Sequence, residues 1–191
     1  MIECWGMRFS YDDLRALKNK PRLHHNGFVQ LDLPNRVRLH VWPEHPPKRP
    51  NVLGMIHNHV YGFDSEILIG SIQNLIYEFD HDSNGEYQLY EVLPYAAAAD
   101  APITLISPQR YIPRITEKFT VSKGERYRME PGRFHETRWD AFSASVIRID
   151  EFDLRKKAKV AFHFGQLPDG NYKRRSVPEK VLWQFIKRVF S

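Results

Sequence analysis

The chain has 191 residues, a net charge of +5, 42% hydrophobic residues and 13% aromatic residues. This length favours one domain, spanning residues 1–191 with a single core, and this apolar content excludes a disordered chain. The basic residues are scattered and no nucleic-acid-binding motif is present, so we interpret the positive charge as a solvated surface. No run approaches the roughly 20 apolar residues that a membrane-spanning helix needs.

The cysteine content and the N-terminal residues bear on the cellular compartment of the protein. Cys4 is the only cysteine, so no disulfide can form within the chain. That favours a reducing compartment over a small secreted scaffold. The N-terminal residues contain no apolar segment of the kind that a signal peptide needs. We therefore expect a cytoplasmic protein.

A short helix is predicted near each end of the chain. Ser10 is a suitable N-cap for a helix over residues 11–18, whose first turn is acidic. Near the other end, the run from Ser176 to Glu179 is similar to a capping box with an early proline. It is followed by an apolar stripe at helical spacing, formed by Val181, Leu182, Phe185, Ile186 and Val189. We expect this second helix, over about 177–190, to pack on the domain and to carry no chemistry.

Between the helices the pattern predicts many short strands separated by turn residues. Residues 43–50 are rich in proline and predict a stiff loop, and residues 95–100 predict a short connector. Strands at such spacing are typical of a β-sandwich or barrel. The predicted strands are 28–33, 36–42, 52–59, 65–69, 73–79, 87–93, 104–106, 118–121, 126–129, 134–138, 143–149 and 159–164.

Two groups of histidines are the strongest functional signal. His57 and His59 are two residues apart, so in an extended strand they point to the same face, about 7 Å apart. Two imidazoles in this arrangement suit one metal ion. A third ligand must come from elsewhere in the fold, and His135 is the candidate.

The frame around the first pair resembles the first motif of the cupin superfamily, Gly-x5-His-x-His followed by a metal-binding Glu and a Gly. The spacing from His59 to Gly70 fits that motif, but Phe63 occupies the position of the usual glutamate. On the leading side, Gly54 is nearer to His57 than the motif requires.

The frame around His135 resembles the second cupin motif, Gly-x5-Pro-x-Gly-x2-His-x3-Asn. Gly124, Gly132 and His135 keep its spacing, whereas Pro131 is shifted by one position and Trp139 replaces the asparagine. The resemblance covers roughly residues 52–150. It implies an all-β double-stranded β-helix, or jelly-roll barrel, with short terminal helices, and one metal ion held by His57, His59 and His135.

Three acidic residues could replace the missing glutamate, but strand alternation argues against them. If Phe63 points inward, then Asp64 and Glu66 both point to the opposite face, and Glu136 points away from the face of its neighbour His135. Three neutral imidazoles remain. Within the cupins, this ligand set resembles that of the thiol dioxygenases, which lack the glutamate. Fe(II) is then the expected ion, with zinc, manganese and nickel left open.

Three further residues are candidates for the site. Phe63 is expected to border the metal pocket. Tyr61 is a candidate catalytic residue that could donate a phenol hydrogen bond, or an ordinary packing aromatic. Arg133 is a second candidate, able to bind an acidic group of a substrate, or a solvated turn residue.

The resemblance therefore predicts a metal-dependent enzyme that oxidises a small-molecule substrate with dioxygen. A non-redox metal cupin, such as an isomerase or a hydrolase, is the first alternative. A metal-free barrel that binds or senses a small molecule is the second. A homodimer is compatible with the resemblance, and no nucleic acid or membrane partner is expected.

Overall fold

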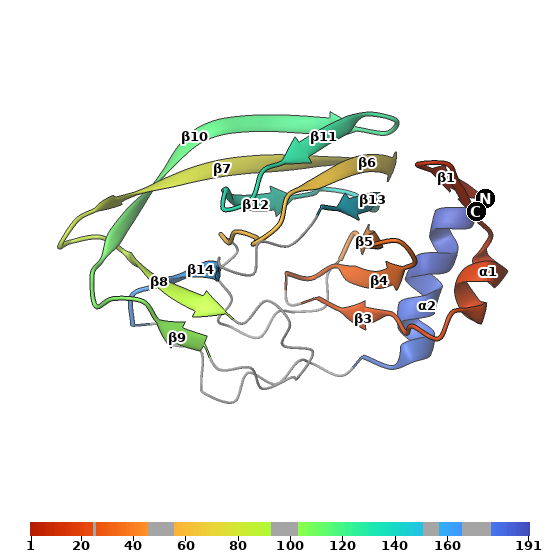
Figure 1. Cartoon of the computed structure of the whole chain (residues 1–191), viewed down its shortest axis with the longest axis horizontal. Coiled ribbons are helices and arrows are strands. Elements are labelled where there is room, and N and C mark those ends of the chain that lie inside the picture. Colours follow the sequence, from red (N-terminus) through yellow and green to blue (C-terminus); the bar gives the residue numbers. More distant parts are fainter. Residues whose placement is uncertain (25, 46–55, 93–102, 151–156, 166–176) are drawn as a thin grey trace.

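The computed structural model describes residues 1–24, 26–45, 56–92, 103–150, 157–165 and 177–191 (Figure 1). Strands dominate these residues, and both described α-helices lie at one end of the molecule, close to the chain termini. The strands form two six-stranded sheets and one two-stranded sheet, and all paired strands are antiparallel. The prediction of an all-β fold with short helices near its ends is confirmed.

The two large sheets are called sheet I and sheet II here. Sheet I has the strand order β11-β6-β13-β5-β4-β3, and sheet II has the order β12-β7-β10-β8-β14, with β9 beside β8. The strands of sheet I are β3 (Arg22–Leu23), β4 (Val29–Leu33), β5 (Val37–Trp42), β6 (Phe63–Ile69), β11 (Arg126–Met129) and β13 (Ser143–Ile149). Those of sheet II are β7 (Ser71–His81), β8 (Tyr87–Val92), β9 (Ile103–Leu105), β10 (Tyr111–Ser122), β12 (Phe134–Arg138) and β14 (Ala158–His163). The small sheet pairs β1 (Ile2–Cys4) with β2 (Met7–Phe9).

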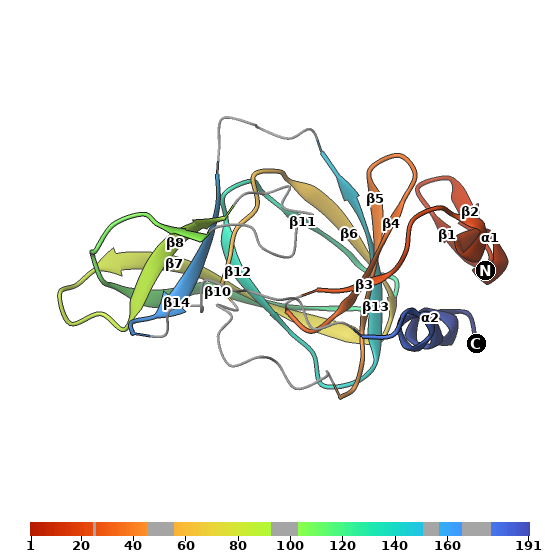
Figure 2. The ribbon, with the colours of Figure 1, turned by 90° about the horizontal axis from the view of Figure 1, so that it is seen from below.

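Two long stretches of chain form one antiparallel ribbon. β7 pairs with β10, β6 pairs with β11, and His57 pairs with His135, with a bulge between Ile115 and Glu117. β5 and β13 extend the ribbon beyond the histidines. The ribbon coils on itself, because β12 also pairs with β7 and β13 also pairs with β6. This arrangement is a double-stranded β-helix, as the resemblance predicted (Figure 2).

Side-chain alternation explains how β6 fits between the core and solvent. Phe63, Ser65 and Ile67 are buried, whereas Asp64 and Glu66 lie on the opposite face. There the two carboxylates pair with arginines of neighbouring strands, at Arg126, Arg128 and Arg148. A period of two along the strand therefore separates an apolar inner face from a charged outer face.

The outer parts of β7 and β10 contribute to a smaller lobe with β8, β9 and β14 (Figure 2). Residues 56–58 lie between this lobe and the barrel. The amide of Ala161 donates to Ile56 (2.9 Å) and the amide of Asn58 donates to Lys159 (3.0 Å), while His57 pairs with β12. A separate apolar cluster lies among these elements, formed by Ile56, Leu75, Tyr77, Leu89 and Ala161. The strand pattern alone did not predict this second cluster.

Both predicted helices are present with shorter bounds. α1 (Tyr11–Ala16) has the expected cap at Ser10, whose hydroxyl accepts from the amide of Asp13, and it ends before the predicted limit because Leu17 is extended. α2 (Glu179–Lys187) continues as the 3-10 helix η1 (Arg188–Phe190).

Helix α2 packs on the barrel as predicted, but its start differs from the prediction. Its buried residues Leu182, Trp183 and Ile186 join the core cluster that includes β4, β5 and β13. The N-cap residue is Pro178, which makes no side-chain capping bond, and the proposed capping residue Ser176 lies outside the described residues.

The strand predictions were least accurate for β10. The prediction covered residues 118–121, but the strand begins at Tyr111. Pro113 and a bulge interrupt the local pattern, and pairing along β7 nevertheless keeps the whole segment extended. The short strands β1, β2 and β3 were not predicted. No described helix is long and apolar enough to cross a membrane.

Some predictions concern residues outside the described part of the chain. These are most of the proline-rich loop at 43–50, the connector at 95–100, the first residues of the strand predicted at 52–59, and Gly54.

The tight corner at Gly70 yields a first test. Gly70 has φ +70° between β6 and β7, and a Cβ there would lie 2.5 Å from Ser143 Oγ and 2.6 Å from the Phe142 carbonyl oxygen. Gly124 has a similar φ of +85° with no neighbour within 4 Å. Gly124→Ala should therefore lower the free energy of unfolding by about 1 kcal/mol, from backbone strain alone. Gly70→Ala should lower it by about 1–3 kcal/mol more than Gly124→Ala does, because the added Cβ overlaps with neighbouring atoms. Urea unfolding measures both, and equal losses would contradict the packing described at this corner.

Candidate metal centre

A backbone bridge between His57 and His135 of β12 brings the three predicted histidines together, although the described residues 56–59 form only isolated bridges and not the strand predicted there. His57 and His135 exchange both backbone hydrogen bonds, at 3.0 and 2.8 Å, so their side chains lie side by side on one face. His59 follows two residues later on the same face. The ring centroids are 4.5 Å apart for His57 and His135, 4.8 Å for His57 and His59, and 5.1 Å for His59 and His135.

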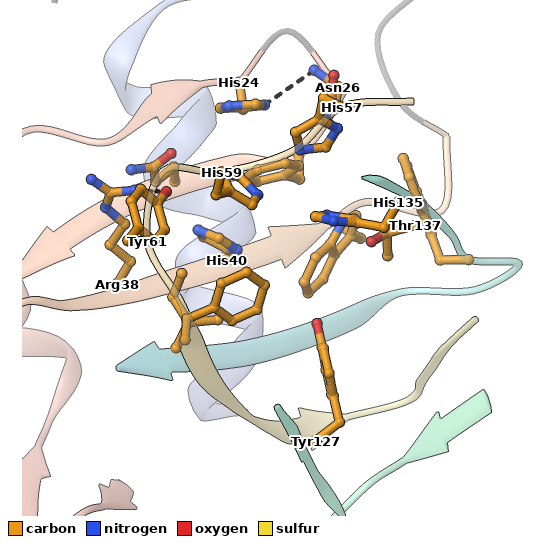
Figure 3. A pocket seen from close by; sticks show the side chains of 16 residues that line it. His24, Asn26, Arg38, His40, His57, His59, Tyr61, Tyr127, His135 and Thr137 are labelled. Atoms are coloured by element: carbon orange, nitrogen blue, oxygen red, sulfur yellow. Dashed lines mark hydrogen bonds between the residues drawn. The ribbon is translucent and has the colours of Figure 1, made fainter. Parts of the chain in front are cut away.

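The ring nitrogens of these residues converge. One nitrogen from each of His57, His59 and His135 lies within 4.8 Å of the other two (Figure 3). The turn before β12 helps to hold this arrangement, because the amide of Gly132 donates to the carbonyl of His59 at 2.8 Å. Gly132 has φ +82°, a conformation that glycine adopts without strain.

The protonation state of the histidines suits a metal ligand. Burial, with smaller effects from His57 and His135, holds the pKa of His59 well below its usual value. Burial and the proximity of His57 likewise lower the pKa of His135, although a backbone group of Arg133 acts in the opposite direction. Both rings are therefore neutral near pH 7. A neutral imidazole has the lone pair that binds a metal ion.

Two further observations fit a metal at this position. The buried Nδ1 of His135 has no hydrogen-bond partner in the described part of the chain. The side-chain amide of Asn26 lies 3.4 Å from Nδ1 of His57. An amide oxygen turned to this position would accept a hydrogen bond from Nδ1–H and leave Nε2 of His57 to bind the ion. The residues present therefore fit a bound divalent metal.

The histidines line a cavity inside the barrel. The cavity volume is about 60 Å³. Among the described residues of its wall, none is acidic and one, Arg38, is permanently charged. The wall consists of His24, Asn26, Phe28, Gln30, Arg38, His40, Trp42, His57, His59, Tyr61, Phe63, Tyr127, His135, Thr137, Trp139 and Ile147.

Phe63 lies on the cavity wall, where the resemblance would place a glutamate. Its ring centroid is 5.6 Å from that of His59 and 6.4 Å from that of His135. The carboxylates considered as replacements lie elsewhere. Asp64 and Glu66 are on the outer face of β6, and Glu136 points toward the smaller lobe, where it accepts a hydrogen bond from Tyr77 (2.8 Å).

Tyr61 lies beside the histidines and belongs to a polar network. Its ring stacks on His59 with centroids 4.9 Å apart, and its hydroxyl accepts a hydrogen bond from Arg38 at 2.9 Å. Arg38 in turn pairs with Asp32 at 3.0 Å. Burial alone would raise the pKa of Asp32, but hydrogen bonds from Arg22 and Gln30 and the nearby arginine charges lower it. Asp32 is therefore ionised and holds Arg38 in place.

The structure does not bring Arg133 into the cavity wall. Its guanidinium pairs with Glu117 of β10, and it is absent from the described residues that line the cavity. A catalytic role for Arg133 stays a prediction.

β5 contributes wall residues that were not predicted from the sequence. Arg38, His40 and Trp42 alternate with the core residues of that strand and line the cavity. The alternation was visible in the sequence, but it was interpreted only as a strand. Two polar residues at every second position of an otherwise apolar strand could have indicated an inner polar surface. Tyr127 of β11 was also overlooked as a wall residue.

Comparisons with known proteins concern the fold. No protein family matches the chain, and no curated protein matches it significantly. Similar solved structures include a hydroquinone 1,2-dioxygenase from Sphingomonas sp. TTNP3 with 4-hydroxybenzoate bound, at 8% identity over 64% of each chain and a TM-score of 0.33. The match thus spans less than two thirds of that dioxygenase.

Two other solved structures are similar. A protein from Neisseria meningitidis shares 13% identity over 75% of this chain and 100% of its own, with a TM-score of 0.33. A protein with a double-stranded β-helix domain from Klebsiella pneumoniae shares 15% identity over 76% of this chain and 90% of its own, also with a TM-score of 0.33.

The lowered histidine pKa values predict how stability depends on pH. A histidine whose folded pKa lies below its unfolded value of 6.5 contributes stability above pH 6.5, and this contribution is lost as pH falls toward the folded pKa. The metal-free protein should therefore lose stability between pH 7.5 and 5.5. His135→Gln should weaken this dependence, whereas His81→Gln, at an exposed site, should leave it unchanged. Urea unfolding at the two pH values measures the effect, and an unaltered dependence in His135→Gln would contradict it.

Proposed function

We propose that His57, His59 and His135 bind one divalent metal ion and that the protein is an enzyme that oxidises a small molecule with dioxygen. The observation that supports this most directly is the convergence of three imidazole nitrogens within 4.8 Å in the wall of a cavity. Fe(II) is the expected ion, and zinc, manganese or nickel could occupy the same ligands. When bound, Fe(II) would supply the one-electron and dioxygen chemistry that protein side chains lack.

The chain itself would contribute position, charge and exclusion of water. Three neutral ligands and a described wall without carboxylates leave the positive charge of the ion uncompensated, which favours an electron-rich substrate. Phe63 closes one side of the site with an apolar ring. Tyr61, fixed by Arg38, presents a phenol beside His59 and would position a substrate group by hydrogen bonding. A homodimer and a cytoplasmic location stay predictions.

Metal content gives the first test of this proposal. Protein purified without added metal should contain close to one ion per chain by elemental analysis. His57→Ala and His135→Ala should each reduce this content by about tenfold or more, because a ligand is lost from the ion. Glu66→Ala is the matched control. Its carboxylate pairs with Arg126 on the outer face of β6, so its metal content should stay unchanged.

The outcomes separate the proposed function from its alternatives. Absence of metal from the wild type, after supplementation with Fe(II) and Zn(II), would favour a metal-free binding or sensing barrel. A protein that holds metal but consumes no oxygen with small phenols or thiols would favour an isomerase or a hydrolase. Full occupancy in either histidine variant would show that the ligands are wrongly assigned.

Phe63 provides a second test, because its ring lies close to His59 and His135. Phe63→Glu would place a carboxylate beside the ion. The variant should bind the metal more tightly and have a lower reduction potential, since a nearby anion stabilises the higher oxidation state. Metal competition titration and redox titration measure the two effects. Phe63→Leu, which adds no charge, is the control, and identical values for all three proteins would place Phe63 away from the ion.

A further inference from the structure

His40 lies on the cavity wall without a role in the site described above. It belongs to β5, where Leu39 and Val41 face the main apolar core and the alternate residues face the cavity. In Figure 3, His40 lies in the same space as His59 and His135. Among the described residues, the nitrogens that converge within 4.8 Å belong to three other histidines, and His40 is not part of that cluster.

The His40 ring is held by aromatic neighbours rather than by hydrogen bonds. Its centroid is 4.5 Å from that of Phe28 and 5.8 Å from that of Trp42. Nε2 of His40 is enclosed and has no hydrogen-bond partner among the described residues. In the same part of the chain, Nδ1 of His40 makes no hydrogen bond either. An imidazole that serves only packing usually has a partner for at least one nitrogen, because an unsatisfied buried polar group costs stability.

The charge state of His40 favours hydrogen bonding over ion pairing. Burial, assisted by the positive charge of Arg38, lowers the pKa of His40 to about 3. The ring is thus neutral at physiological pH and offers one N–H donor and one acceptor. Its side of the cavity also contains Arg38, and no described wall residue is acidic. A small anion or an oxygen-bearing group between His40 and the three histidines would meet complementary polarity.

We propose that His40 is a ligand-contacting residue, whose ring nitrogen Nδ1, the one that is not enclosed, donates a hydrogen bond to the molecule that binds in the cavity between it and the three-histidine cluster. The ligand class is a small molecule that presents an anionic or electron-rich oxygen or nitrogen atom to the cavity. This inference rests on the proposed metal site, because that site defines where the ligand is bound. His40 then determines which ligands are retained, while His57, His59 and His135 hold the ion.

The test uses azide as a small anionic probe and Co(II) as a spectroscopically visible metal. Wild type, His40→Leu and His40→Gln are loaded with Co(II), their metal content is measured, and azide binding is followed by the visible absorption of the cobalt. His40→Leu should keep its metal but bind azide about fivefold more weakly, the effect of losing one ordinary hydrogen bond. His40→Gln, whose amide can still donate, should recover part of this affinity.

Stability distinguishes a ligand contact from a structural role. The substitution His40→Leu removes a buried nitrogen that has no hydrogen-bond partner and puts an apolar side chain in its place. The melting temperature of the metal-free variant should therefore be no lower than that of the metal-free wild type. His81→Leu, at an exposed site on β7, is the matched control and should change neither azide affinity nor metal content.

Two outcomes would overturn the inference, and they differ from each other. A wild type that takes up no Co(II) would refute the metal site and, with it, the role of His40. A wild type that binds Co(II) and azide, with azide affinity in His40→Leu within twofold of wild type, would leave the metal site intact and refute the contact. Loss of cobalt from His40→Leu alone would show instead that His40 is a fourth ligand, which also overturns the proposal as stated.

Discussion

The backbone pairing of His57 with His135 is the constraint on which the site depends. The two residues form a hydrogen-bonded antiparallel pair, so their side chains share a face at close range. A slip of one residue would place Phe134 or Glu136 opposite His57 and turn the imidazole of His135 toward the smaller lobe. The long pairing of β7 with β10 and the pairing of β6 with β11 extend the same ribbon, and they make such a slip costly.

The same strands serve two compartments because side chains alternate. His135 and Thr137 of β12 line the cavity, while Phe134 packs with the apolar cluster of the smaller lobe and Glu136 bonds to Tyr77 there. Residues 56–58 also contribute side chains to both compartments, since Ile56 packs in the apolar cluster of the smaller lobe and His57 belongs to the candidate metal centre. A substitution on one face can therefore disturb the other only through the shared backbone.

The described cavity wall contains one permanently charged side chain, Arg38, and no carboxylate, and the nearby carboxylates of β4 and β6 outside the cavity are paired with arginines. On the outer face of β6, Asp64 and Glu66 pair with arginines of neighbouring strands. Asp32 holds Arg38 from behind, which orients the guanidinium toward Tyr61 without placing a carboxylate on the described cavity wall. The buried histidines respond by staying neutral, because the dry surroundings disfavour their charged form. Neutral imidazoles around the proposed metal ion would suit an anionic or electron-rich ligand.

Local sequence determined the two histidine frames, the capped helix α1 and the faces of β6, because these depend on spacing within one segment. The period of two was enough to separate Phe63 from Glu66. Only the tertiary structure decided the length of β10, the smaller lobe and the contribution of Arg38 and His40. Those features arise from pairing between residues far apart in the chain. Alternation along β5 marks its polar face, but only the partner strand and the opposite cavity wall, which no local pattern specifies, place that face beside the candidate metal centre.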